Sequence, residues 1–441
     1  MRISGHPFRS ASLMALGIAL CSSLSAGAQA QAQSAGANAA PSADPAGLGE
    51  IVVTAQRREQ NIQDVSIAIQ AITAEGLARS GVTDVARLEL IAPGVTYARY
   101  GSDSKISLRG ANSNNTFLDA SPSVGAFVDG VYRPRASQQT RSFFDVQRLE
   151  VLKGPQGTLY GRNTLAGAIN LYTNAPSTAE LEAQALVSYS RFAHLRTEGF
   201  INVPLSDNFA VRFAGLAERS DGWVENLAGP DLGALDTISF RASARYEGDN
   251  GGDITLRITN VRERGTNTGL FAFTGTCRNV TAQGLTDPFG TQLDCRNPRR
   301  GSAGSRRFDQ LERLQVLKDF VHEDRIDELN ATLEVNAPVF SDISFKGIFS
   351  YTDFDLDLGQ DSDFSEVRVS ADFLRERVES YTAEVQFGNS TENRLQFLVG
   401  GYASHDSIDF LSGAIRFSRD DQTVRPLIPV PPYNGVCPVP T

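Results

Sequence analysis

Residues 236–246 read Asp-Thr-Ile-Ser-Phe-Arg-Ala-Ser-Ala-Arg-Tyr, and their pattern decides the fold. Apolar residues occupy positions 238, 240, 242, 244 and 246, and polar or charged residues occupy the positions between them. This period of two is that of a β-strand, whose successive side chains point to opposite faces of a sheet. The segment therefore predicts a strand with one apolar face and one polar face.

The same alternation recurs from about residue 179 onward. Residues 328–337 repeat it clearly, and less regular runs follow the same rule at 181–189, 209–217, 254–258, 343–351, 381–387 and 395–399. A soluble β-sandwich also alternates, but the two clearest runs here each carry one wholly polar or charged face. They are also long enough to cross a bilayer at a tilt, which takes about 9–11 residues.

The connections between these strands differ in length on the two sides of the sheet. Short turns are predicted at 205–208, 248–252, 338–341 and 389–393, whereas longer links occupy 221–235, 263–324 and 356–375. Short turns on one side and long loops on the other are typical of a bacterial outer-membrane β-barrel. We therefore expect residues 179–441 to form antiparallel transmembrane barrel strands.

The barrel is expected to be incomplete in this chain. About nine strands are predicted, and the chain then runs into a proline-rich outer loop at 426–440. Single-chain bacterial barrels need an even number of strands and a closed edge, because unpaired backbone groups are not tolerated in hydrocarbon. We expect the sequence to be the first part of a longer protein, either as a fragment or as a truncated gene product.

The N-terminal residues and the composition place the protein outside the cytoplasm. The chain has 441 residues and a net charge of −10, which argues against nucleic acid as a partner. Residues 11–20 form a short apolar run after Arg2 and Arg9, and Ala28-Gln29-Ala30 suits cleavage, so residues 1–30 predict a secretory signal peptide. Residues 31–49 predict a disordered leader.

Three cysteines remain after the predicted cleavage site. Cys277 and Cys295 flank a Gly/Thr/Pro/Asn-rich segment and are candidates for a disulfide, because exported proteins fold in an oxidising compartment. Such a bridge would contribute about 3 kcal/mol in the chain-entropy view. Two free thiols are the alternative, and Cys437 has no evident partner.

Residues 50–176 precede the barrel strands and have a different character. Residues 50–58, Glu-Ile-Val-Val-Thr-Ala-Gln-Arg-Arg, are rich in β-branched residues and favour an extended strand. That strand is either a site of pairing with a partner protein or the first strand of the next domain. Residues 60–176 predict a mixed α/β domain, with Thr73 and Thr83 as helix N-caps. Its strands are expected at 105–109, 123–129, 148–153 and 168–172.

Several motifs in residues 50–176 together resemble the TonB-dependent outer-membrane receptors. In order, they are Glu50-Ile-Val-Val-Thr-Ala55, Ser107-Leu-Arg-Gly110, Pro122-Ser-Val-Gly-Ala-Phe-Val-Asp-Gly-Val-Tyr132, Phe144-Asp-Val-Gln-Arg-Leu-Glu-Val-Leu-Lys-Gly-Pro-Gln-Gly-Thr-Leu-Tyr-Gly-Arg-Asn163 and Gly167-Ala-Ile-Asn170. Each motif alone is weak, but all of them in this order and spacing are specific. The resemblance covers residues 50–176 closely and the barrel only in pattern.

The resemblance implies roles for particular residues. Glu50, Ile51, Val52, Val53, Thr54 and Ala55 match the TonB box, within 50–58, that pairs with TonB by strand addition. Residues 60–176 match the plug that fills the barrel. Arg109 and Arg162 match plug arginines that hold the plug through carboxylates of the barrel wall, although they are equally expected to solvate the plug surface. The carboxylate partners are not identifiable from sequence.

The remaining charged motifs point to neither catalysis nor metal binding. Gly154-Pro-Gln-Gly157 lacks the Lys-Ser/Thr of a phosphate loop and predicts a tight turn. Asp353, Asp355 and Asp357 resemble a calcium loop, but Leu358 replaces the required glycine, so we expect a barrel strand with its acidic face toward the lumen. No catalytic constellation, metal site or cofactor is expected. Five arginines at 296–307 suggest an anionic ligand, a solvated loop or a lipopolysaccharide contact.

The sequence thus favours an energy-coupled transporter in the bacterial outer membrane, and no enzyme. By resemblance, its partners are TonB with its inner-membrane energising complex, outer-membrane lipids and a ferric chelate, with a ferric siderophore as the expected cargo. Saccharide or cobalamin uptake and a passive porin or surface-binding protein are the alternatives. A monomer is expected, and the transported substrate and its binding residues are not identifiable from sequence.

Overall fold

The computed structural model describes most of the chain from residue 52 onward. The described residues are 52–54, 57–58, 60–100, 103–111, 122–139, 142–226, 230–266, 314–316, 323–340, 342–361, 370–389, 393–417 and 424–425. Residues 50–441 form one compact unit, and all that follows concerns that unit. The predicted signal peptide, leader and Cys277–Cys295 bridge, together with Cys437 and the 296–307 arginines, lie outside the described residues.

The N-terminal domain is built around a five-stranded mixed sheet. Its strands, in spatial order, are β3 (Ile69–Thr73), β8 (Val146–Lys153), β9 (Gly167–Thr173), β6 (Val124–Val128) and β7 (Val131–Arg133). Only the β6–β9 pair is parallel. The other elements of this domain are β1 (Val52–Val53), β2 (Gln60–Asn61), β4 (Val95–Tyr100), β5 (Asp103–Leu108), α1 (Ala74–Ser80), α2 (Gly157–Tyr160) and the 3₁₀ turns η1 (Ile62–Asp64), η2 (Val85–Leu90) and η3 (Ala136–Gln138).

The helix boundaries follow from capping, with one correction to the sequence prediction. The Thr73 side chain accepts a hydrogen bond from the Gly76 amide, so Thr73 caps α1 as predicted. Thr83 was the wrong choice for the second helical segment, because the Asp84 carboxylate caps η2 by accepting from the Arg87 amide at 2.9 Å. The Thr83 carbonyl instead accepts from the Phe143 amide.

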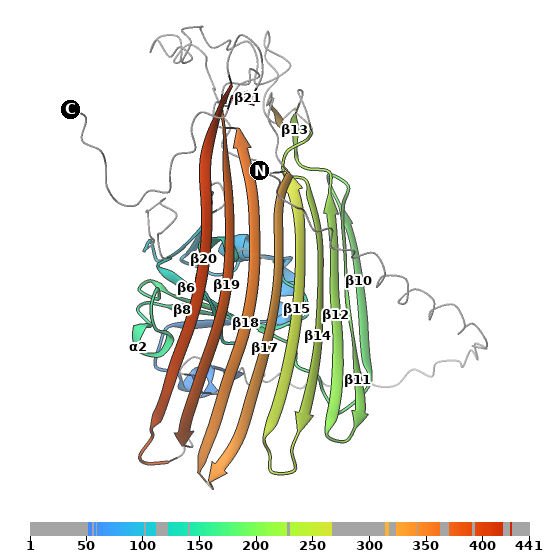
Figure 1. Ribbon diagram of the computed structural model, residues 1–441. Coiled ribbons are helices and arrows are strands. Elements are labelled where there is room, and N and C mark those ends of the chain that lie inside the picture. The colour runs from blue at the N-terminus through green and yellow to red at the C-terminus, as the bar shows by residue number, and fades with distance from the viewer. Residues whose placement is uncertain are drawn as a thin grey trace, which may run out of the picture. The chain divides into compact units, whose positions relative to one another are not determined.

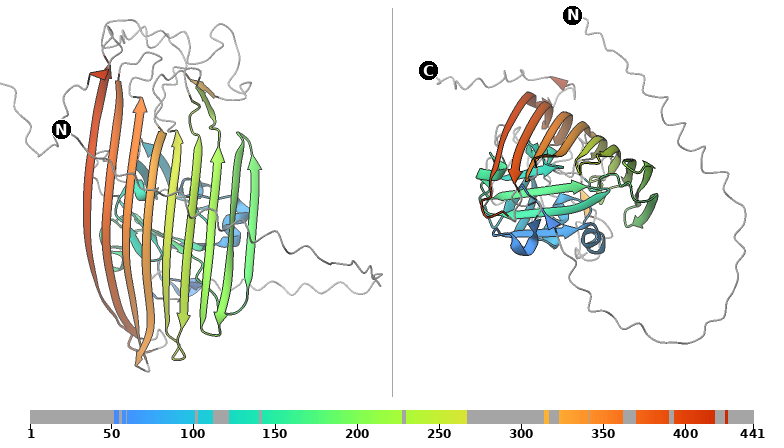
Figure 2. Two further views of the ribbon diagram at one scale, coloured as in Figure 1. Left: turned by 45° about the vertical axis from the view of Figure 1, so that its right-hand side comes forward. Right: turned by 90° about the horizontal axis from the view of Figure 1, so that it is seen from below.

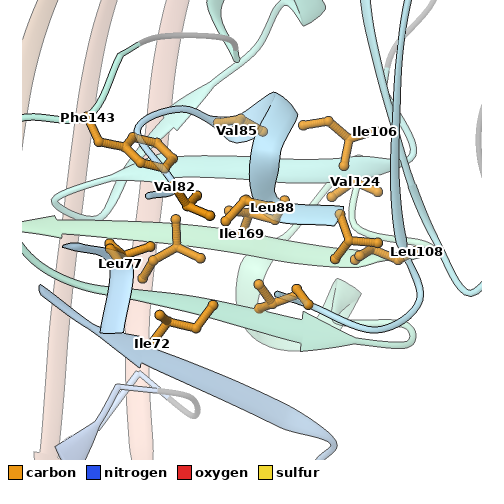
Figure 3. Packing of buried hydrophobic residues seen from close by; sticks show 14 of the residues in the cluster. Ile72, Leu77, Val82, Val85, Leu88, Ile106, Leu108, Val124, Phe143 and Ile169 are labelled. Carbon is orange, nitrogen blue, oxygen red and sulfur yellow. The ribbon is translucent and has the colours of Figure 1, made fainter. Parts of the chain in front are cut away.

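The core of the N-terminal domain lies between its sheet and the segment that carries α1 and η2. Figure 3 shows Leu77, Val85 and Leu88 pointing from this segment toward Ile169 on the sheet. Leu88 and Leu149 are fully buried. Burying a side chain of this size contributes about 1.5–3 kcal/mol, so this cluster holds the domain together.

A second sheet of ten strands follows the N-terminal domain, and we call it the wall sheet. Figures 1 and 2 show its long strands running side by side. In order they are β10 (Glu182–Ser190), β11 (His194–Ser206), β12 (Phe209–Ser220), β14 (Leu235–Glu247), β15 (Asp253–Thr266), β17 (Glu323–Phe340), β18 (Ile343–Asp361), β19 (Ser370–Asn389), β20 (Leu398–Phe417) and the short β21 (Val424–Arg425). A separate parallel pair joins β13 (Val224–Asn226) to β16 (Leu314–Val316).

The predicted fold class is confirmed by this sheet. All of its pairings are antiparallel, its nine long strands match the expected number, and among the described strands β10 and β21 are unpaired edges of an open sheet. The four predicted short turns lie where β11 meets β12, β14 meets β15, β17 meets β18 and β19 meets β20. The predicted link at 356–375 was too long, since β18 extends to Asp361 and β19 begins at Ser370.

The wall sheet exposes its apolar side chains and buries its polar ones, which is the reverse of the arrangement in a water-soluble protein. On β14, Ile238, Phe240 and Tyr246 are 41–49% exposed, whereas the intervening Thr237 and Ser239 are buried. The same inversion continues on β15, where Leu256 is exposed and Thr255 is buried. An exposed apolar face with a buried polar face suits a wall that meets hydrocarbon outside and polar groups inside. No helix among the described residues is long and apolar enough to cross a membrane.

The acidic residues of β18 correct a second prediction. Asp353, Asp355 and Asp357 lie on the outward face, not on the lumen face as expected. Toward the end of the strand the inner face becomes apolar, because Phe354 and Leu356 pack there with Ile326 and Val378 of the neighbouring strands. The outward ring pair Tyr351–Tyr381 lies just before the acidic residues. Aromatic pairs of this kind mark the edge of the apolar band of a barrel, so Asp353–Asp357 lie beyond it.

An arginine on the exposed apolar face is expected to destabilise the wall sheet. Leu256→Arg places a charge on the hydrocarbon side of β15 and is expected to cost about 2–4 kcal/mol if it lies near the bilayer midplane. Leu256→Ala is the control, because it removes volume without adding charge. The measurement is the fraction of heat-modifiable, folded protein in outer membranes. Equal folded fractions for the two variants would contradict the assignment of this face to lipid.

Candidate functional site

The first described residues of the chain are docked onto the N-terminal domain. Val52 and Val53 form β1, which pairs antiparallel with β2. The Val53 side chain is fully buried in a cluster with Phe127, Leu152 and Tyr160. The sequence left two alternatives for this segment, namely pairing with a partner protein or forming the first strand of the next domain. In this structure it forms the first strand of the N-terminal domain, so one of its edges is already paired.

Thr54 makes three hydrogen bonds to residues about a hundred positions away in the sequence. Its amide donates to the Glu150 carboxylate at 2.9 Å, its carbonyl accepts from the Tyr160 hydroxyl at 3.0 Å, and its hydroxyl accepts from the Arg148 guanidinium at 2.6 Å. Glu150 is completely buried on β8 and also accepts from Arg148. A buried carboxylate with charge-assisted hydrogen bonds is a strong anchor, so β8 fixes the position of Thr54.

Arg57 connects the same segment to the wall sheet. Its guanidinium lies 4.6 Å from the centre of the Tyr160 ring and 5.5 Å from that of Phe127, and it donates to the Leu159 carbonyl at 3.1 Å. The same group forms an ion pair with Glu384 of β19 at 3.3 Å, and both side chains are only 13% exposed. The backbone of Arg57 is left-handed, with φ at 61°, a conformation that costs energy in a non-glycine residue. The side-chain contacts offset that cost.

Tyr160 is the residue that these contacts share. Burial raises the pKa of its phenol to about 12, so the hydroxyl remains neutral and able to donate throughout the physiological range. The hydroxyl donates to Thr54 and accepts from the Asn170 amide at 3.0 Å. One face of the ring supports Arg57, and its edge meets Phe127. Tyr160 therefore joins α2 to the docked segment.

A second group of contacts anchors residues 129–145 of the N-terminal domain to the wall sheet. Asp145 accepts two hydrogen bonds from Arg212 of β12, at 2.6 and 2.9 Å, and both side chains are nearly buried. Arg133 pairs with Glu328 of β17 at 2.8 Å. Glu376 of β19 accepts from both Arg135 and Ser137. These pairs are buried and hydrogen-bonded, which makes the loss of one partner costly.

The two arginines singled out from the sequence differ in their surroundings. The Arg162 guanidinium lies 2.9 Å from the Asp406 carboxylate of β20, although 59% of the arginine side chain is exposed. Arg109 is exposed, and within the described residues no ion pair involves it. Its amide donates to the Gly94 carbonyl, and its φ is 54°. The locking role of both residues remains a prediction.

Sequence reasoning missed four residues that join the N-terminal domain to the wall sheet. These residues are Arg57, Arg133, Arg135 and Asp145. Each lies inside or next to a segment quoted in the sequence analysis, but the sequence alone did not identify its partner. Asp145 has a φ of 49°, as does Asp129. Aspartate is one of the few residues that tolerates this conformation, so an Asp before a strand was a usable signal.

Comparison with known proteins agrees with this geometry. The family described as TonB-dependent Receptor Plug Domain matches residues 61–168. These residues form a TonB-dependent receptor plug domain. The chain as a whole resembles TonB-dependent outer-membrane receptors, with a plug followed by the first part of a barrel, as the sequence motifs predicted.

Curated relatives support the resemblance over the first half of the chain. The pesticin receptor of Yersinia pestis is 32% identical over 213 residues, which cover 47% of this chain and 29% of that protein. An iron-regulated outer membrane virulence protein of Vibrio cholerae is 26% identical over 250 residues, covering 52% of this chain and 36% of that protein. The chain thus spans about a third of the length of these relatives.

Solved structures show the same fold. The ferric yersiniabactin uptake receptor FyuA of Yersinia pestis superposes with a TM-score of 0.63 at 20% identity, covering 79% of this chain and 50% of that one. The siderophore receptor PiuA of Acinetobacter baumannii gives a TM-score of 0.61 at 15% identity, covering 83% of this chain and 49% of that one. At these identities the likeness establishes fold, and the chain spans about half of each structure.

Removing the Asp145 carboxylate is expected to loosen the plug. Asp145→Asn leaves the buried Arg212 without its main counter-charge, which is expected to cost about 3 kcal/mol of plug docking. Digestion of the plug by proteinase K in outer membranes should then become more than about tenfold faster. Glu75→Gln is the control, since the exposed Glu75–Arg79 pair at 3.8 Å is worth less than about 1 kcal/mol. Equal digestion rates in both variants would show that the Asp145–Arg212 pair does not anchor the plug.

Tyr160 gives a prediction for mutation and for pH. Tyr160→Phe removes the hydrogen bond to Thr54 and should weaken docking of residues 52–58 by about 1 kcal/mol. The pKa of Tyr160 is raised to about 12 while the segment is docked. Its stabilisation of the docked segment is therefore complete below the ordinary phenol pKa of about 10, and it is lost as the pH rises through about 12. Tryptic cleavage after Arg58, taken relative to cleavage after Arg79, should rise in the mutant. In the wild type this ratio should stay constant between about pH 7 and pH 9, and a rise over that range would contradict a neutral docked phenol.

Proposed function

We propose that the protein is a TonB-dependent transporter of the bacterial outer membrane that takes up a ferric siderophore. The observation that carries this proposal is the docked segment Val52–Arg58, joined both to the plug and to the wall sheet. A transporter driven from the periplasm needs such a segment, because force applied to it reaches the plug. Three of the proteins compared are named receptors, and the names of several refer to iron or to siderophores.

The proposed partner is TonB, which would add a strand to residues 50–55. Strand addition uses backbone hydrogen bonds of an exposed edge, but β1 already pairs with β2, and Val53 is buried. Burial of Val53 contributes about 1.5–3 kcal/mol, and each hydrogen bond of Thr54 contributes about 1 kcal/mol. TonB would therefore meet a segment that is docked for most of the time. In this mechanism a ligand on the outer side of the plug favours release of the segment.

The plug anchors fit a transporter better than a passive filler. Arg133 and Asp145 hold one part of the plug to the wall through ion pairs in which no side chain is more than 8% exposed, whereas Arg162, which pairs with Asp406, is 59% exposed. The pairs of Arg57 and Arg135 lie between these extremes. Unequal anchoring permits one part to move while another stays in place. A chain with this arrangement is expected to act as a monomer, surrounded by outer-membrane lipids. Cobalamin remains an alternative cargo, because a vitamin B12 transporter of Vibrio vulnificus is 27% identical over 210 residues.

The direct test is deletion of residues 51–54 from the complete gene. Uptake of radioiron carried by yersiniabactin or by enterobactin should fall to background in cells that carry the deletion, while binding of the same chelates at the cell surface persists. Deletion of residues 37–40, in the predicted leader, is the length-matched control and should leave uptake unchanged. Undiminished uptake with intact surface binding in the 51–54 deletion would reject coupling to TonB. Uptake that a protonophore does not reduce would support a passive porin.

A further inference from the structure

Strands β17–β20 of the wall sheet, which lie side by side in Figure 1, are longer than a bilayer requires. They contain 18, 19, 20 and 20 residues, whereas a tilted strand crosses the hydrocarbon with about 9–11. Two ring pairs mark the crossing part: Phe345–Phe387 lies near the short turns, and Tyr351–Tyr381 lies further along the same strands. Because the short turns of such a barrel face the periplasm, the rest of these strands projects beyond the membrane outside the cell.

A hollow of about 560 Å³ lies on the projecting part of these four strands. Eight of its eleven lining residues occupy the odd-numbered positions that face outward. The other three alternate with them along β18, β19 and β20. The outward set contains three arginines and four carboxylates, namely Arg325, Arg375, Arg377, Asp327, Asp355, Asp357 and Asp409. The hollow is thus a charged surface that opens away from the plug and toward the outer leaflet.

The arginines of the hollow retain donors that a ligand can use. Their side chains are 57–64% exposed. The Arg377 guanidinium lies 3.7 Å from Asp353 and 3.9 Å from Asp355, which is too far for a hydrogen bond, and Arg375 donates through Nε to Asp357 at 3.1 Å. A guanidinium carries five N–H donors in a planar fork that matches phosphate, and an ionised carboxylate accepts strongly from hydroxyl groups. Together they suit a phosphorylated sugar.

The height of the hollow selects among the lipids of a bacterial outer membrane. Asp355 and Asp357 lie four and six residues beyond Tyr351. At a rise of about 3.4 Å per residue and a tilt of about 40°, this places the hollow about 10–16 Å beyond the ring pair. A phospholipid head group extends only about 5–8 Å beyond the hydrocarbon. The occupant therefore needs a larger head group, and in the outer leaflet the lipid that has one is a glycolipid.

We propose that this hollow on β17–β20 binds a phosphorylated sugar in the core of lipopolysaccharide. Arg375 and Arg377 bind the phosphate, and Asp355 and Asp409 accept hydrogen bonds from the sugar hydroxyls. The contact attaches the projecting strands to the surrounding leaflet. This inference needs the outer-membrane location of the chain, but it does not rest on the proposed transport.

The first test removes two arginines from the hollow. Arg375→Gln with Arg377→Gln is compared with Arg219→Gln and Arg262→Gln, which removes two exposed outward arginines of β12 and β15 that do not line the hollow. Each protein, made from the complete gene, is titrated calorimetrically with deacylated rough lipopolysaccharide, a soluble phosphorylated oligosaccharide. The Kd should rise at least about tenfold in the first variant and less than about twofold in the second. Equal changes in both variants, or no change in either, would overturn the proposal.

A second measurement keeps the proposal testable if the first variant does not fold. The wild type is titrated with the same oligosaccharide after hydrofluoric acid has removed its phosphates, and with the bisphosphorylated glucosamine disaccharide of lipid A, which lacks the core. Both should bind at least about tenfold more weakly than the intact oligosaccharide. Undiminished binding of the dephosphorylated sugar would show that phosphate is not recognised. Undiminished binding of the disaccharide would show that the core is not needed, and either result would overturn the proposal.

This inference and the proposed function fail separately. If cells that lack residues 51–54 still take up the chelate, coupling to TonB is wrong, although the hollow can still bind the oligosaccharide. If uptake needs these residues but the variant Arg375→Gln with Arg377→Gln binds the oligosaccharide as the wild type does, the transporter stands and only the glycolipid site is wrong.

Discussion

The architecture depends on the need of the wall sheet to present apolar side chains to hydrocarbon. Because strand side chains alternate, this requirement sends every second residue to the other face, where arginines, glutamates and threonines accumulate. A polar inner face of this kind must be hydrated or paired, since buried unpaired charges are costly. The plug supplies the pairing. Arg133, Arg135 and Asp145 each pair with an opposite charge of the wall, so the apolar outer face of the wall indirectly determines where the plug needs charged residues.

The sequence predicted the parts of this fold that rest on local patterns. Alternation at 236–246 and 328–337 identified strands, and the short breaks between alternating runs located four hairpins. The acidic face of β18 was assigned to the wrong side because alternation defines two faces without saying which is inside. Phe354 and Leu356 face inward there, so the usual polarity of the wall is reversed beyond Tyr351. Only three-dimensional packing distinguishes the two cases.

The candidate site was predictable in its location but not in its contacts. The β-branched run at 51–54 marked the segment, yet the residues that hold it are distant in sequence: Glu150 and Tyr160 lie about a hundred positions away, and Glu384 more than three hundred. Pairs of such separation leave no trace in a single sequence. Arg57 illustrates the limit, since an arginine beside a predicted TonB box carries no sign that it stacks on Tyr160 and reaches β19.

Only two residues of β1 are described, Val52 and Val53, and their position at the start of the docked segment has a mechanical consequence. A force applied from the N-terminal side loads Val52 first and reaches Thr54 and Arg57 only after the preceding contact has given way. The contacts are then broken one at a time, as in the opening of a zipper, so the peak force is set by the strongest single contact and not by their sum. A longer ladder loaded in shear would resist as a unit. A short strand followed by a few side-chain anchors therefore yields to a modest, sustained pull while remaining docked against thermal motion.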